Sequence, residues 1–281
     1  MASHQRGSIL CPNCRKLISA DESRCPYCGI ASPGSWWKNN VWTRVFLGTD
    51  QLIRTIIYAN LGMYVISLLL NPLSSGFSLN PLYFLSPANK SLLLLGATGT
   101  LPIDHLHRWW TLVSANYLHG GILHILFNML AFRQIARLVL QEYGAYRMLI
   151  LYTLSGVTGF LVSYLAGVRF TIGASAAVCG LIGATLYYGK SRGGVYGQAI
   201  FRQIGGWALG LFLFGLLVPR VNNWGHGGGI FAGVILGFLL GYQERVRESL
   251  FHKILAGVCV GLTLLILGWA VVSGIYYGVL G

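Results

Sequence analysis

The sequence predicts an all-α polytopic membrane protein with a small cysteine-rich domain at its N-terminus. Three observations predict this class. Hydrophobic residues make up 54% of the 281 residues and charged residues only 10%, far below the roughly 25% of soluble domains. Several apolar runs are long enough to cross a bilayer as helices, which takes about 20 residues. Four of the six cysteines fall within the first 28 residues as two Cys-x-x-Cys pairs.

The formal net charge of +13 does not indicate a nucleic-acid partner. The basic residues are dispersed between apolar blocks, whereas a nucleic-acid-binding face gathers them in one stripe. We therefore expect the chain to be embedded in a lipid bilayer and not to bind nucleic acid. No apolar segment of signal-peptide length precedes residue 40, so we expect a first membrane helix to direct insertion.

The N-terminal cysteines have the spacing of a structural zinc site. Two Cys-Pro-x-Cys turns are separated by ten residues and supply four sulfur ligands, Cys11, Cys14, Cys25 and Cys28. Two disulfides are the alternative, which a reducing cytoplasm disfavours. A zinc ion with four protein ligands has no open position for catalysis. We expect it to hold together a zinc-ribbon-like module over residues 1–32, with a linker over residues 33–51.

Seven apolar runs predict seven membrane helices after this linker. The fifth run is short, and the domain boundary falls near residues 32–38. The runs are Leu52–Leu70, Ile122–Leu140, Tyr146–Ala166, Gly173–Gly189, Ile204–Pro219, Gly225–Tyr242 and Ile254–Tyr276.

The placement of Lys and Arg predicts the orientation. With the N-terminus inside, 16 of these residues fall on the inner side and four on the outer side. Cytoplasmic loops carry such an excess, so we expect a cytoplasmic N-terminus and an outer C-terminus. In a bacterium the membrane would be the plasma membrane. Trp109 and Trp110 lie in the long segment between the first two spans, which we expect to rest partly in the headgroup layer.

Polar residues inside spans are expensive and therefore candidates for function. His124 and Asn128 are four residues apart, on one face of the second expected helix. Taken alone, they could be hydrogen-bonding contacts between helices. Ser175 lies in the first turn of the fourth expected helix, where backbone N–H groups lack partners and can stabilise an anion. Serine in a membrane helix is otherwise usually a small packing residue.

His226 lies at the outer end of the sixth expected helix, on a face that continues with glycines. The fourth expected helix has a matching row of small residues, so the two helices can pack closely. Such packing would bring His226 to Ser175, because both residues lie at the outer ends of their helices. The two rows are Gly229, Gly233 and Gly237 on one helix and Ala176, Gly180 and Ala184 on the other.

Together these motifs resemble the rhomboid family of intramembrane proteases. The resemblance rests on His-x-x-x-Asn on the second expected helix, Gly-x-Ser on the fourth, and His followed by spaced glycines on the sixth. The outer segment from Trp109 to His119 also looks like the family's entry to its second helix. The resemblance covers residues 52–242 and implies a six-helix core. The seventh helix, within residues 243–281, would then be an addition that follows a cytoplasmic turn.

The resemblance implies a Ser-His dyad with Ser175 as nucleophile and His226 as general base, without a third carboxylate. His124 and Asn128 would hold the oxyanion together with the Ser175 backbone N–H. Supporting positions would be Gly173, Gly180, Gly229, Gly233, His119 and Trp110. The implied reaction is hydrolysis of peptide bonds in or next to the transmembrane helices of single-pass or polytopic membrane proteins. It needs no cofactor.

Two positions depart from the family's pattern. Ala176 follows the nucleophile where glycine is usual, and Thr111 follows the loop tryptophan where arginine is common. Arg108 is the nearest replacement for that arginine. Cys179 and Cys259 lie singly in apolar segments and are interpreted as inert packing.

Two other functions compete with the protease. A protein on the same scaffold could bind or escort membrane clients without cutting them, although such relatives usually lack the serine or the histidine. A transporter could use His124 and His226 as a proton relay, although no carboxylate accompanies them.

Glu142 and Glu244 lie at the cytoplasmic helix ends, where we expect structural bonds. Neither the substrate nor the oligomeric state is indicated.

Overall fold

A computed structural model describes residues 7–11, 16–27, 29, 31–35, 49–71, 76–77, 84–218 and 221–280. The chain divides into two units, Met1–Arg54 and Thr55–Gly281. The helical class predicted from the sequence is confirmed, because long helices make up most of the second unit.

The first unit contains a small β-hairpin. Strand β1 (Ser8–Leu10) pairs antiparallel with β2 (Leu17–Ser19). Cys11, Ile18 and Cys25 are buried together beside this hairpin, so one cysteine from each Cys-x-x-Cys pair enters the same core. Cys14 and Cys28 lie outside the described residues, and the predicted zinc site is therefore only partly within them.

The described residues form a long helix at each of the seven places that the sequence predicted. Six of these helices, all except α9, are apolar and long enough to cross a membrane. Helix α3 begins in the first unit and continues into the second. The seven are α3 (Thr49–Leu69), α7 (Ile122–Tyr143), α8 (Ala145–Leu165), α9 (Ser175–Arg192), α10 (Gly194–Leu217), α11 (Asn223–Leu240) and α12 (Leu250–Ile275), which ends in a π-helical turn, η4 (Tyr276–Leu280).

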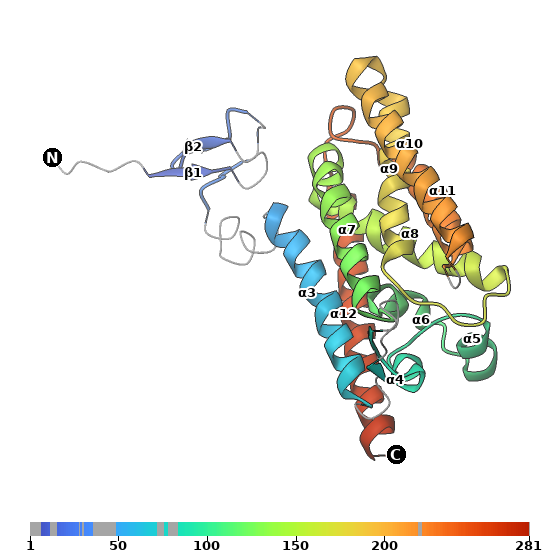
Figure 1. The fold of residues 1–281 in the computed structure, drawn as a ribbon. Coiled ribbons are helices and arrows are strands. Elements are labelled where there is room, and N and C mark those ends of the chain that lie inside the picture. The colour runs from blue at the N-terminus through green and yellow to red at the C-terminus, as the bar shows by residue number, and fades with distance from the viewer. Residues whose placement is uncertain are drawn as a thin grey trace. The chain divides into compact units, whose positions relative to one another are not determined.

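Helix α9 differs from the other six because protein surrounds it. It contacts α7, α8, α10 and α11 (Figure 1, yellow). Twelve of its 18 residues are buried. A helix enclosed by other helices needs small side chains for close packing more than it needs apolar ones for lipid.

Several helix ends lie three or more residues from the predicted ones, for example at α10 and α7. Helix α10 begins at Gly194 and not near Ile204, and α7 continues to Tyr143 beyond Leu140. Apolar composition marks the part of a helix that lies in lipid, whereas backbone hydrogen bonding continues into the polar turns beyond it.

The described residues between α3 and α7 form short helices and strands that pack against the rest of the second unit. In this segment Thr98 forms an antiparallel bridge with Thr171, which lies just before α9. Ile103 and Leu112 are buried against α8 and Ala176 in one cluster. The segment contains β3 (Gly76–Phe77), β4 (Phe84–Ser86), α4 (Asn89–Leu94), α5 (Thr100–Leu106), α6 (Thr111–Ser114) and the 3-10 helix η3 (Ala115–Tyr117).

Helices α9 and α11 approach each other closely along their small residues. A Cβ atom added to Gly233 would lie 1.9 Å from the Gly180 carbonyl oxygen. One added to Gly229 would lie 2.2 Å from the carbonyl oxygen of Ala176. No side chain fits at either position, so glycine is what allows the two backbones to touch.

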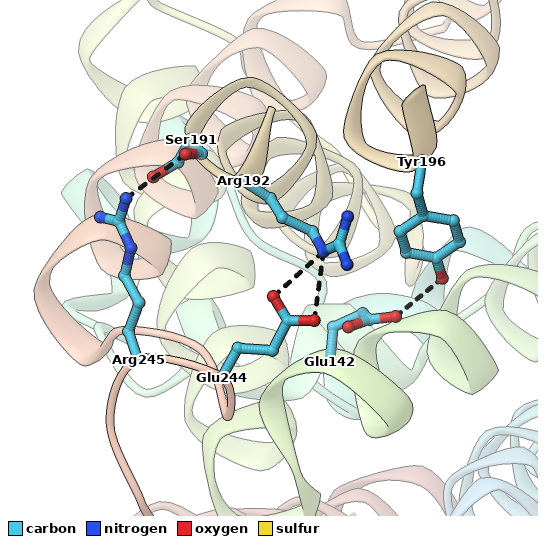
Figure 2. A network of polar contacts seen from close by, with 6 residues as sticks. All are labelled: Glu142, Ser191, Arg192, Tyr196, Glu244 and Arg245. Carbon is cyan, nitrogen blue, oxygen red and sulfur yellow. Dashed lines mark hydrogen bonds and ion pairs between the residues drawn. The ribbon is translucent and has the colours of Figure 1, made fainter. Parts of the chain in front are cut away.

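A polar network (Figure 2) joins the helices at the C-terminal end of α9, whereas Ser175 lies at the other end of this helix. Arg192, the last residue of α9, pairs with Glu244 in the loop after α11 at 3.0 Å. Tyr196 on α10 donates a hydrogen bond of 2.9 Å to Glu142 on α7. Both glutamates therefore make the structural bonds that their positions suggested.

The loop before α12 attaches this last helix to the core. One Glu248 carboxylate oxygen accepts hydrogen bonds from the backbone N–H groups of Tyr146 and Arg147, at 3.0 and 3.1 Å. A carboxylate stabilises these N–H groups because they belong to the first turn of α8. The buried Arg147 side chain donates to the Val246 carbonyl at 2.6 Å in the same loop.

Candidate active site

Ser175 and His226 meet at the beginnings of α9 and α11. His226 Nε2 lies 2.9 Å from Ser175 Oγ, which is hydrogen-bonding distance. His226 is buried, with 7% of its surface exposed, whereas Ser175 is half-buried. Ser175 is the first residue of α9, so its backbone N–H points out of the helix end and has no partner within the helix.

The His226 ring has no second partner in the described part of the chain. Its Nδ1 atom is buried and makes no hydrogen bond there. In the serine proteases with a triad, a carboxylate at this position holds the imidazole in the correct tautomer. Here the orientation of the ring must come from packing and from the backbone of α11.

His124 on α7 presents one ring nitrogen to the same region. The Gly120 backbone N–H donates to His124 Nδ1 at 3.2 Å. In the neutral ring this bond leaves the proton on Nε2, which makes Nε2 a hydrogen-bond donor.

Gly173 keeps open the space between that donor and Ser175. A Cβ atom on Gly173 would lie 2.8 Å from His124 Nε2 and 3.6 Å from Ser175 Oγ. The φ angle of Gly173, +127°, also disfavours any other residue. The position therefore provides room for a reacting group between the two side chains.

Asn128 and His119 flank His124. Asn128 lies one turn further along α7 and its side-chain amide donates to the His124 carbonyl at 2.8 Å, which leaves its second N–H available. His119 is fully buried, and its ring contacts the His124 ring edge to face with centroids 5.1 Å apart. Burial lowers the pKa of His119 well below its usual value, and His124 lowers it further, so His119 is neutral.

Comparison with known proteins places these residues in one family. A family model described as a Rhomboid domain matches residues 106–243. RHOMBOID-like protein 1 of Arabidopsis thaliana is 34% identical over 224 residues, which cover 72% of this chain and 56% of that protein. RHOMBOID-like protein 2 of the same plant is 32% identical over 214 residues, 68% of this chain and 67% of that protein. The chain belongs to the rhomboid family.

A bacterial rhomboid is similar as well. Rhomboid protease GluP of Bacillus subtilis is 33% identical over 136 residues, which cover 48% of this chain and 27% of that protein. This chain spans about half the length of several rhomboid relatives that it matches, for example 52% of RHOMBOID-like protein 5 of Arabidopsis thaliana. The matched rhomboid domain contains all four polar residues of the site and ends before α12.

The rhomboid fold accommodates Ala176 in place of the usual glycine. Ala176 is 1% exposed and faces Gly159 on α8. A Cβ atom on Gly159 would lie only 3.0 Å from the Ala176 methyl group, so the absence of a side chain on α8 makes room for the one on α9.

The second departure from the family's pattern is Thr111 in place of arginine, and it concerns how the outer segment is anchored. Thr111 is buried, and its hydroxyl donates to the Arg108 carbonyl at 2.6 Å. The Arg108 side chain donates to the Leu93 carbonyl at 3.2 Å, so an arginine does bind the backbone of this rhomboid's outer segment. Trp110 packs against Gly96 nearby, where an added Cβ would lie 2.4 Å from the indole.

One residue of the site was missed by the sequence prediction. Asn222 precedes α11 as its N-cap residue, and its side chain bonds to Ser163 and Thr171. The available signal was an asparagine one turn before His226, since asparagine is among the preferred N-cap residues. Its partners on other elements had no signal in the local sequence.

Proposed function

We propose that this chain is an intramembrane serine endopeptidase that cuts membrane proteins in or next to their transmembrane helices. The observation that carries the proposal is the 2.9 Å contact between Ser175 Oγ and His226 Nε2. The contact lies at the start of two helices whose backbones touch. The family to which this chain belongs also includes a named protease.

The proposed reaction proceeds through an acyl-enzyme. Ser175 Oγ bonds to the scissile carbonyl carbon while its proton passes to His226 Nε2. The resulting oxyanion accepts hydrogen bonds from the Ser175 backbone N–H and from His124 Nε2–H, with Asn128 as a further donor. The C–N bond then breaks, and His226 returns the proton to the leaving amine. Water attacks the ester in the second half, with His226 again as base, and frees Ser175.

The proposed substrates are single-pass or polytopic membrane proteins. A helical peptide bond is shielded by its own side chains and hydrogen bonds, so the substrate helix must unwind before Ser175 can attack. Helix-weakening residues such as glycine or proline near the cut would lower the cost of unwinding by about 1–3 kcal/mol.

A fluorophosphonate probe tests the proposed nucleophile. We expect the folded wild type to be labelled and to cut a model transmembrane substrate, and Ser175→Ala to lose labelling. Cleavage by this variant should fall by about 10⁴-fold or more, as in other serine proteases. Ser273→Ala, on α12, is the control and should keep both activities.

Two outcomes would speak against the protease. Cleavage by Ser175→Ala at the wild-type rate would remove this serine from the mechanism. A folded wild type that is neither labelled nor active would instead favour a protein that binds or escorts membrane clients on the same scaffold.

We also propose the orientation with the N-terminus in the cytoplasm and the C-terminus outside. The excess of Lys and Arg in the segments assigned to the inner side supports it. In cells that express a variant whose native cysteines are replaced by serine, a membrane-impermeant maleimide should label Lys90→Cys in intact cells and Arg247→Cys only after permeabilisation. The reverse pattern would overturn this orientation.

The four N-terminal cysteines are proposed to bind one structural zinc ion. Cys11 and Cys25 come from different Cys-x-x-Cys pairs yet are buried in one cluster, which fits ligands that converge on one metal. Bound zinc would crosslink the two turns of a unit that is otherwise too small for a stable core.

A further inference from the structure

The position of His226 depends on how α11 begins, because no carboxylate among the described residues bonds to its Nδ1 and orients the ring. Asn222 makes two hydrogen bonds at this helix start. Its side-chain oxygen accepts from the Gly225 N–H at 3.0 Å. Its backbone carbonyl accepts from the N–H of His226 itself at 3.1 Å. Asn222 therefore determines where the turn that carries His226 lies.

The amide nitrogen of Asn222 connects this turn to two other elements. It donates to Ser163 Oγ on α8 at 2.7 Å and to Thr171 Oγ1 at 2.9 Å. Ser163 is fully buried and Thr171 is 7% exposed, so both acceptors are shielded from solvent. An amide nitrogen has two hydrogens, and both are used here.

Thr171 is itself a well-fixed point four residues before Ser175. Its backbone exchanges two hydrogen bonds with Thr98, of 2.8 and 3.1 Å. Two residues later the Gly173 N–H donates to the Ala115 carbonyl at 2.9 Å. The segment that leads into Ser175 is thus held by the outer segment on one side and by Asn222 on the other.

We propose that Asn222 is a positioning residue that sets the distance between Ser175 and His226. It holds the start of α11 against the segment that carries the serine, in place of the carboxylate that orients histidine in a triad. This inference rests on the proposed protease function for its kinetic test. It adds a residue that neither contacts the substrate nor takes a proton.

A residue that only caps α11 needs the hydrogen bond from the Gly225 N–H but not those to Ser163 and Thr171. The capping role and the positioning role can therefore be tested separately. Asn222→Ser keeps an N-cap oxygen but is too short to reach Ser163 and Thr171. Asn222→Asp keeps the cap, and both hydroxyls can donate to its carboxylate. The neighbouring Asn223→Ser is the matched control, since Asn223 Oδ1 has no hydrogen-bond partner within the described ranges.

The test compares these variants of the full chain in detergent or liposomes. For Asn222→Ser we expect kcat and the fluorophosphonate labelling rate to fall about 10- to 100-fold, because small misplacements of catalytic groups have effects of this size. KM should stay within about twofold, and the unfolding temperature should fall by only a few degrees, since the cap remains while two hydrogen bonds to buried hydroxyls are lost. Asn222→Asp and Asn223→Ser should resemble the wild type.

A double-mutant cycle locates the effect. Thr171→Val removes the hydroxyl that accepts from Asn222, and it should lower kcat in the wild type but hardly at all in Asn222→Ser. Additive losses would show that the two residues act independently and would overturn the proposal. So would a wild-type kcat in Asn222→Ser, or an equal loss in Asn222→Asp.

Nitrogen NMR of histidine-labelled protein gives a readout that needs no activity. The His226 Nε2 resonance can be identified by its loss in His226→Ala. Its chemical shift should be that of a hydrogen-bonded nitrogen in the wild type and in Asn222→Asp but not in Asn222→Ser. If the wild type neither cuts nor reacts with the probe, the proposed function fails, and this spectrum still decides the role of Asn222. An unchanged Nε2 signal in Asn222→Ser would refute it.

Discussion

The proton of His124 is placed by a single backbone hydrogen bond. Because Gly120 N–H occupies Nδ1, the neutral ring can only donate from Nε2, the atom that borders the space beside Ser175. A donor already oriented before the reaction stabilises developing negative charge without reorganisation. In the proposed reaction His124 would act through this tautomer, whereas His226 would need the opposite tautomer, with the proton on Nδ1 and Nε2 free to accept.

His124→Ala tests this donor. We expect kcat for a model transmembrane substrate to fall by about 100- to 1,000-fold, the usual effect of losing one oxyanion donor, with KM little changed. His105→Ala, an exposed histidine on α5, should cut normally. A variant without His124 that keeps its kcat would show that the oxyanion is held by other groups.

Helices α9 and α11 are the element pair on which the site depends. Their glycines bring one backbone against the other, and this contact sets Ser175 and His226 at the same level. Lipid offers no hydrophobic driving force between helices, so close van der Waals contact must supply much of the stability.

Gly233→Ala tests that contact. Its new methyl group would overlap the Gly180 carbonyl, and we expect a loss of about 1–3 kcal/mol in the free energy of unfolding, measured by denaturation in mixed micelles. Gly227→Ala is the control on the same helix, because no atom lies within 4 Å of its added Cβ. Both variants gain the same helix propensity, so their difference isolates the overlap. Equal stability of the two would contradict the close approach.

The whole molecule extends beyond the matched rhomboid domain at both ends. The cysteine unit precedes this domain, and α12 follows it and packs against α8. All four proposed zinc ligands lie in the first unit. Four sulfur ligands leave a zinc ion no open position for catalysis, so we expect the proposed metal to be structural.

Metal analysis of the purified protein tests the cysteine unit. We expect about one zinc ion per chain and its loss in Cys25→Ser, because four-sulfur sites need every ligand. Fluorophosphonate labelling should be unchanged after this loss, since no step of the proposed reaction uses the metal. Two disulfides and no zinc would support the alternative that the spacing left open.

The local sequence was sufficient to predict the helices, one close helix contact and several residues of the candidate site. Apolar runs placed all seven helices, of which six are long and apolar enough to cross a membrane, whereas the seventh, α9, is not. The small rows on α9 and α11 predicted their close approach, because helical periodicity assigns residues to faces. His124 and Asn128 were found because polar residues are rare in spans.

Only the tertiary structure decided how these parts fit together. Asn222 bonds to residues 59 and 51 positions away, and Gly159 makes room for Ala176 from another helix. The start of α10 was missed because Gln198, Arg202 and Gln203 interrupt the apolar residues of its first turns. Hydropathy and helical spacing describe each segment by itself, whereas hydrogen bonds and steric fit between distant segments depend on coordinates that no local pattern contains.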